Sequence, residues 1–99
     1  MSIGDLSFKL ATNLEHLYLP SSIKHIGQGC FHRCYNLNIV EIDADVIYLN
    51  ERMFKAAINL KTAIISNKNI KRLESEVFDD CYSLSSISFA NKDIEIIKP

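Results

Sequence analysis

The sequence has little glycine and proline, no excess of either charge and no long hydrophobic run. With 3 glycines and 2 prolines in 99 residues, it contains no Gly-rich phosphate loop, linker or low-complexity tract, so we expect a single domain over residues 1–99. The 11 basic and 12 acidic residues nearly cancel, which argues against a nucleic-acid partner. No segment is long and apolar enough to insert into a membrane, and residues 1–10 lack the charged-then-apolar pattern of a signal peptide.

A repeat of 23 or 24 residues runs through the whole chain. Two series mark it, one of phenylalanines and one of leucines six residues later: Phe8, Phe31, Phe54 and Phe78, then Leu14, Leu37, Leu60 and Leu84. Such a period is typical of a solenoid, in which one small unit stacks on copies of itself. The four copies are expected at residues 3–25, 26–48, 49–72 and 73–96, and a fifth starts at Ile97.

The hydrophobic period changes inside each copy. Around Leu37–Ile42 it is two, with Val40 and Ile42 on one side and Ile39 and Glu41 on the other, which predicts a short strand with one buried face. From Phe31 to Leu37 the spacing is three, which predicts one short helical or 3₁₀ turn. The expected class is therefore α/β, with about four stacked units that each contain one short strand and one such turn.

The most regular motif runs from Leu19 to Leu37, across the end of the first copy and the start of the second. Its landmarks are Leu19, Pro20, Ile23, Ile26, Gly27, Phe31, Cys34 and Leu37. This pattern resembles one unit of the BspA-like leucine-rich repeats, and the resemblance covers essentially the whole chain. The third copy departs most, with Asn50, Ala57 and Ala63 in place of glycine, cysteine and a larger aliphatic residue. The resemblance implies a leucine-rich repeat solenoid, and members that are largely surface or secreted proteins engaged in adhesion and protein binding.

A polar residue stands just before each leucine of the series. These residues are Asn13, Asn36, Asn59 and Ser83. We predict a ladder in which their side chains satisfy backbone groups of the neighbouring copy, as in other leucine-rich repeats. Asn and Ser are also common turn residues without such a role.

The three cysteines do not form a disulfide or metal framework. Cys34 and Cys81 hold equivalent positions two copies apart, which places them about 10 Å from each other and too far to bridge. Cys30 and Cys34 have His32 nearby, but no second pair completes a four-ligand zinc site. Free, buried thiols are the better interpretation, and they favour a reducing, cytoplasmic compartment, whereas the family resemblance allows the cell surface.

No constellation of residues points to catalysis. HExxH and nucleophile-elbow motifs are absent, and His16, His25 and His32 fall on different faces of the unit. An open solenoid surface also lacks the closed, dry cavity in which electrostatic catalysis is strong. We therefore expect no enzyme, no catalytic residue, no cofactor and no metal.

Outward strand positions form the best candidate binding surface. Two columns are expected across the sheet, His16, Ile39, Thr62 and Ser86 in one and Tyr18, Glu41, Ile64 and Ser88 in the other. Exposed aromatic and aliphatic groups around one charge are what the centre of a protein-binding patch needs. The sequence thus favours a non-enzymatic scaffold that binds an unidentified protein.

The alternative function is a structural spacer or a self-associating part of a longer array. No polar cap is visible at either end, so the outer copies are expected to expose core side chains and free strand edges. Phe8, Leu14, Leu17 and Leu19 at one end, and Leu84, Ile87, Phe89, Ile94 and Ile97 at the other, are the residues concerned.

Overall fold

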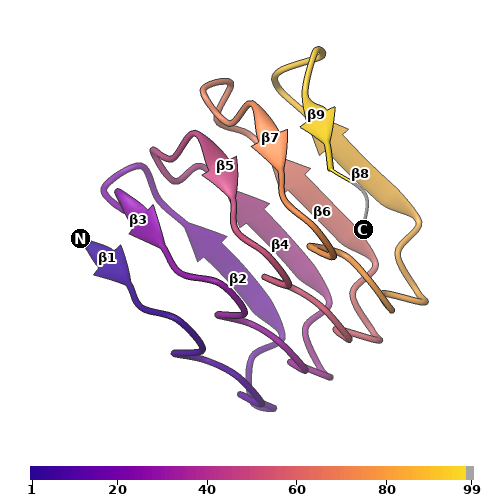
Figure 1. Ribbon diagram of the computed structural model, residues 1–99. Coiled ribbons are helices and arrows are strands. Elements are labelled where there is room, and N and C mark those ends of the chain that lie inside the picture. Colours follow the sequence, from indigo (N-terminus) through magenta and orange to yellow (C-terminus); the bar gives the residue numbers. More distant parts are fainter. Residues whose placement is uncertain (98–99) are drawn as a thin grey trace.

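The computed structural model, which describes residues 1–97, is a solenoid of parallel strands and turns in which each coil lies on the next (Figure 1). One four-stranded sheet forms its broad side. Its strands are β2 (His16–Leu19), β4 (Ile39–Ile42), β6 (Thr62–Ile65) and β8 (Ser86–Phe89), in that spatial order and all parallel. One strand per 23 or 24 residues confirms the solenoid and its repeat length.

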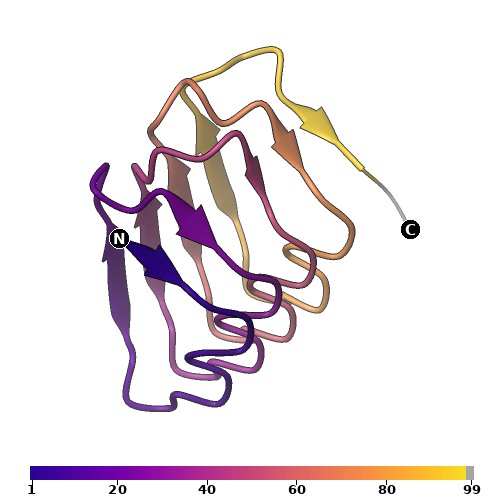
Figure 2. The same ribbon diagram turned by 60° about the vertical axis from the view of Figure 1, so that its left-hand side comes forward.

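Shorter strands line the opposite side of the coils (Figure 2). They are β1 (Ser2–Ile3) paired with β3 (His25–Ile26), and β5 (Tyr48–Leu49), β7 (Arg72–Leu73) and β9 (Glu95–Ile96) in a second row. The last pairing places Ile96 opposite Leu73, so the fifth copy opens one residue earlier than the predicted Ile97. Residues 98–99, also assigned to that copy, lie outside the described part of the chain.

The phenylalanine series forms a continuous stack through the core. The ring centroids of Phe31 and Phe54 are 5.4 Å apart, and Phe8 and Phe78 extend the stack at 5.4 and 5.6 Å. Phe31 and Phe54 are fully buried, whereas Phe8 is 42% exposed because no coil covers it in the structure. The ring spacing is slightly wider than the usual separation of neighbouring strands, about 4.8 Å, so one phenylalanine per coil fills the same layer of the core.

The inward strand positions complete the core. Val40 and Ile42 of β4 and Ala63 and Ile65 of β6 are almost completely buried, as the alternation predicts. In the outer coils the same positions are less covered, and Ile87 is 40% exposed. Of the end residues expected to be uncovered, Leu19 is the exception, because it is 3% exposed.

The segment after each coil's opening strand is a series of turns and not a helix. The N–H of His32 donates to the carbonyl of Gly29 in its own coil at 3.1 Å, but the N–H of Phe31 donates to the carbonyl of Met53 in the next coil at 2.9 Å. Gly29 and Arg33 have positive φ angles of 62° and 60°. Left-handed residues and bonds to the next coil interrupt the regular pattern that a helix requires.

The predicted helical or 3₁₀ turn is therefore not found in residues 1–97, and the α/β class is corrected to a parallel β-solenoid. Apolar residues three positions apart fit a chain of tight turns as well as a helical turn, so the pattern alone does not distinguish the two. No helix that could span a membrane occurs in the same residues.

Candidate protein-binding face

All eight residues expected on the outer side of the sheet lie there. The register pairs His16 with Ile39, Ile39 with Thr62 and Thr62 with Ser86 in one column, and Tyr18, Glu41, Ile64 and Ser88 in the other. We call these eight residues the outer sheet face. The strand register explains their arrangement, since equal repeat length brings equal positions side by side.

The apolar centre of the outer sheet face is open to solvent. Tyr18 is 56% exposed and Ile39 is 38% exposed, while Ile64 is half-buried beside them. Tyr18 and Ile64 flank Glu41 on its two sides along the second column. The surface is therefore a mixed aromatic and aliphatic patch around one carboxylate.

Charge on this face is sparse and of one sign. Glu41 is the one acidic residue in the four strands, which contain no Lys or Arg. The side chain of Glu41 is half-buried and makes no ion pair or hydrogen bond within residues 1–97. Asp43, the second residue after Glu41, points outward too, because Ile42 and Ala44 on either side of it are fully buried.

The predicted polar ladder is present in the central coils. The side-chain amide of Asn36 donates to the carbonyl of Thr12 at 2.8 Å, and that of Asn59 donates to the carbonyl of Tyr35 at 2.8 Å. These bonds join each coil to the one before it, which fixes the turn that leads into the sheet. Within residues 1–97, Ser83 makes no such bond, since its side chain is shorter than that of asparagine.

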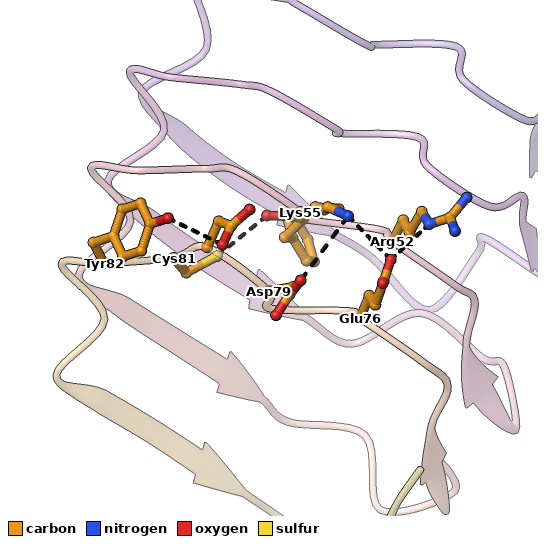
Figure 3. A network of polar contacts seen from close by, with 8 residues as sticks. Arg52, Lys55, Glu76, Asp79, Cys81 and Tyr82 are labelled. Atoms are coloured by element: carbon orange, nitrogen blue, oxygen red, sulfur yellow. Dashed lines mark hydrogen bonds and ion pairs between the residues drawn. The ribbon is translucent and has the colours of Figure 1, made fainter. Parts of the chain in front are cut away.

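The turn edge carries an ion-pair network between the third and fourth coils (Figure 3). Glu76 accepts from Arg52 at 2.7 Å and from Lys55 at 3.2 Å, and Asp79 lies 3.9 Å from Lys55. Arg52 and Lys55 hold the pKa of the Glu76 carboxyl below its usual value. These contacts neutralise neighbouring charges and bind two coils together, a structural role that the sequence did not assign.

A second exposed apolar column, which the sequence reading missed, runs along the same turn edge. It consists of Tyr35, half-buried, Ile58, 38% exposed, and Tyr82, 81% exposed. Each stands four residues after a phenylalanine of the series, and that constant offset is the signal that could have revealed it. The hydroxyl of Tyr82 donates to the carboxylate of Asp80 at 3.1 Å. This bond connects the column to the acidic turn formed by Asp79 and Asp80.

The cysteines are free thiols that donate hydrogen bonds to backbone carbonyls. Cys34 donates to the carbonyl of Phe8 and Cys81 donates to the carbonyl of Phe54, each at 3.2 Å. Burial raises the pKa of Cys34 and raises that of Cys81 to about 11, so both are neutral near pH 7. Within residues 1–97 no three His, Cys, Asp or Glu side chains are grouped to hold a metal ion.

Histidine is also dispersed. His16 lies on the outer sheet face and His25 in β3 on the other side of the coil. His32 is on the turn edge, where partial burial and the surrounding positive charges of Lys9 and Arg33 lower its pKa. The three imidazoles are thus on separate surfaces, as the sequence predicts, and they share no site.

The chain is similar to proteins built from leucine-rich repeats. A family model described as a BspA type leucine rich repeat region (6 copies) matches residues 1–99. A crystal structure of a leucine-rich repeat protein from Eubacterium ventriosum superposes with a TM-score of 0.88 at 23% identity, over 96% of this chain and 32% of that one. A leucine rich cell surface protein from Faecalibacterium prausnitzii gives a TM-score of 0.67 at 22% identity, over 90% of this chain and 29% of that one.

At these identities the two crystal structures establish the shared fold alone. The chain spans about a third of the length of each of them. A comparison with curated proteins gives no match.

Proposed function

The chain belongs to the BspA-type leucine-rich repeat family, and from that premise we propose that it binds a protein partner through the outer sheet face. Repeat families of this kind generally serve as scaffolds for protein interaction, because stacked units present long surfaces. The proposed role is non-enzymatic, and adhesion or host interaction is its biological setting.

The observation that carries the proposal is the group formed by Tyr18 and Ile39, both exposed, and the half-buried Ile64 on adjacent strands β2, β4 and β6. Backbone pairing holds these side chains on a rigid sheet, so little conformational freedom is lost when a partner covers them. Tyrosine is among the residue types that most often dominate the binding energy of protein interfaces. The flanking Thr62, Ser86 and Ser88 supply a polar rim.

The setting is proposed by analogy with a structural neighbour. One of the two similar crystal structures is described as a cell surface protein. An adhesive function at a surface would use the same open sheet, since a partner can reach it without displacing any other part of residues 1–97 (Figure 2).

Affinity capture from a lysate of the source cells, or of a host, tests the proposal. The bait is the whole chain, compared with the triple variant Tyr18→Ser, Ile39→Ser and Ile64→Ser. The expected result is a protein retained by the unaltered chain and lost by the variant, while circular dichroism and the melting temperature show that the variant stays folded.

A matched control removes one tyrosine and two isoleucines elsewhere. The triple variant Ile47→Ser, Tyr48→Ser and Ile96→Ser changes side chains that are 64%, 41% and 54% exposed on the other side of the coils. It should retain the partner. Loss of the partner in both variants, or in neither, would show that the outer sheet face is not the binding surface.

A second candidate function is that of a spacer or self-associating segment. In its favour, the first described coil exposes Leu6, Phe8 and Leu10 at 51%, 42% and 49%, and the last exposes Ile87 and Ile96. Strands β2 and β8 also have one free edge each in the described structure. Analytical sedimentation distinguishes the two functions. Only the spacer function predicts that the chain self-associates, that Phe8→Asp weakens this association, and that the Tyr18/Ile39/Ile64→Ser variant leaves it intact.

A further inference from the structure

We propose that the partner docks on the outer sheet face with an arginine side chain, seated between the ring of Tyr18 and the carboxylate of Glu41. This inference rests on the proposed function and adds the chemistry of the partner. The occupant is a protein segment that carries basic residues among apolar ones.

The first argument is the unmatched charge of Glu41. Glu41 is half-buried, and its register partners on the two neighbouring strands are Tyr18 and Ile64, neither of which is basic. Two other half-buried acidic groups are paired, Glu76 with Arg52 and Glu74 with Arg72, whereas Asp43, two residues beyond Glu41, makes no ion pair within residues 1–97. An unpaired carboxylate loses hydration when a partner covers it, and a positive charge on that partner offsets the free-energy cost of this desolvation.

The second argument is the place of Tyr18. It lies directly opposite Glu41 in the register of β2 and β4, and its ring is 56% exposed. A guanidinium group can lie on an aromatic face and at the same time donate two hydrogen bonds to a carboxylate. The chain uses this combination internally, because the guanidinium of Arg72 lies 5.4 Å from the ring centroid of Tyr48 and donates to Glu74 at 2.8 Å.

The third argument is the charge of the surroundings. Asp43 adds a second outward carboxylate two residues beyond Glu41, and the four strands of the sheet contain no Lys or Arg. Lys61 precedes β6, and Glu15 stands in the corresponding place before β2. A basic partner is thus attracted to the copy that carries Glu41, and an acidic partner is repelled from it.

The test uses a peptide titration of the whole chain followed by NMR. The probe is acetyl-Leu-Arg-Ser-Arg-Leu-amide, whose two arginines are about 7 Å apart when extended, the same separation as two residues on one side of a strand such as Glu41 and Asp43. The control peptide replaces both arginines with citrulline, which keeps the shape and removes the charge.

The expected result is a saturable shift of β2, β4 and β6 amides, with the arginine peptide binding about fivefold or more tighter than the citrulline peptide at low salt. Glu41→Gln should abolish that difference, and about 1 M NaCl should reduce it, because the screening length falls to about 3 Å. The matched control Glu95→Gln, an exposed carboxylate in β9 on the other side of the coil, should preserve it.

Three outcomes would overturn the inference: no saturable shift, equal affinity for the two peptides, or shifts centred on the acidic turn at Asp79 and Asp80. Repeating the capture experiment with Glu41→Gln keeps the two proposals apart. If a partner is lost with the Tyr18/Ile39/Ile64→Ser variant but fully retained by Glu41→Gln, the outer sheet face binds protein and the arginine inference is wrong.

Discussion

The ring of Phe31 stacks on the ring of Phe54 with the centroids 5.4 Å apart and the planes 11° from parallel. The two residues occupy the same position in successive coils, 23 residues apart in sequence. Their contact sets the spacing of the coils on the turn side, as the strand ladder does on the sheet side. The flat outer sheet face depends on this agreement, because its columns stay aligned only while the coils stack in register.

Removing the Phe31 ring should therefore destabilise the fold strongly. Phe31→Ala is expected to lower the free energy of unfolding by about 3–5 kcal/mol, since the ring is 1% exposed and the cavity lies between two other rings. Urea unfolding followed by circular dichroism measures the change. Phe8→Ala is the control and should cost clearly less, because Phe8 is 42% exposed.

If Phe31→Ala fails to fold, Phe31→Leu supplies the comparison, with an expected loss on the order of 1 kcal/mol. Equal losses at Phe31 and Phe8 would contradict the description of a stack that is buried in its centre and open at its first ring.

The Asn59 amide should contribute a measurable part of coil-to-coil stability. Asn59→Ala removes its 2.8 Å bond to the carbonyl of Tyr35, with an expected loss of about 1 kcal/mol. Asn13→Ala changes the same position in the first coil, where residues 1–97 offer no preceding coil to accept the bond, and should stay within ~0.5 kcal/mol of the unaltered chain. Chemical unfolding of both variants provides the test, and equal effects would contradict the ladder.

Cys81 should make the fold less stable at alkaline pH. Burial is the main cause that raises its pKa from 9.0 to about 11, so the folded chain holds the thiol proton more tightly than the unfolded chain. The stabilisation is fully present below pH 9 and is lost as the pH rises through about 11. Cys81→Ala, which copies Ala57 of the preceding coil, should therefore show a smaller decline in stability over this interval.

Thermal unfolding from pH 8 to pH 11 measures the Cys81 effect as the difference between the two proteins. Cys30 and Cys34, whose pKa values are also raised, are common to both and cancel in that difference. Parallel stability curves would mean that the Cys81 thiol is not held in its protonated form by the fold.

The carboxylate of Glu76 should add acid sensitivity. Arg52, and then Lys55, lower its pKa, so its contribution is present above the ordinary value of 4.5 and is lost as the pH falls below it. Glu76→Gln should be slightly less stable than the unaltered chain at pH 7 and should converge with it in acid. The difference should also shrink at high salt, because Arg52 is largely exposed. A difference that persists at low pH would assign the effect to packing instead.

The sequence predicted the parts of the fold that repeat. The Phe and Leu series gave the solenoid and its period, and the alternation at Val40 and Ile42 gave the buried face of the sheet. The columns of the outer sheet face followed from the same alternation, since strands of equal phase pair at equal positions.

What the sequence did not predict depends on backbone angles and on contacts between coils. Left-handed residues such as Arg33 and Ala56 are not types that signal positive φ, so the spacing of three from Phe31 to Leu37 predicts a helical turn where the chain makes a series of tight turns. The fifth copy opens at Ile96 and not at Ile97. Repeat spacing alone cannot locate a one-residue change in the length of a loop. The ion pairs of Glu76 depend on the register between the third and fourth coils. Tyr82 lies in a turn, where no alternation along a strand marks an exposed side chain.

Site-specific photo-crosslinking tests the binding of a partner to the outer sheet face most directly. A photoreactive phenylalanine derivative placed at Tyr18, in the presence of source-cell or host proteins, is expected to form a covalent adduct with a protein partner. The same derivative placed at Tyr82, an even more exposed tyrosine at 81%, is expected to give none. Adducts at Tyr82 and not at Tyr18, or adducts only with a second copy of this chain, would contradict the assignment of this face as the binding surface.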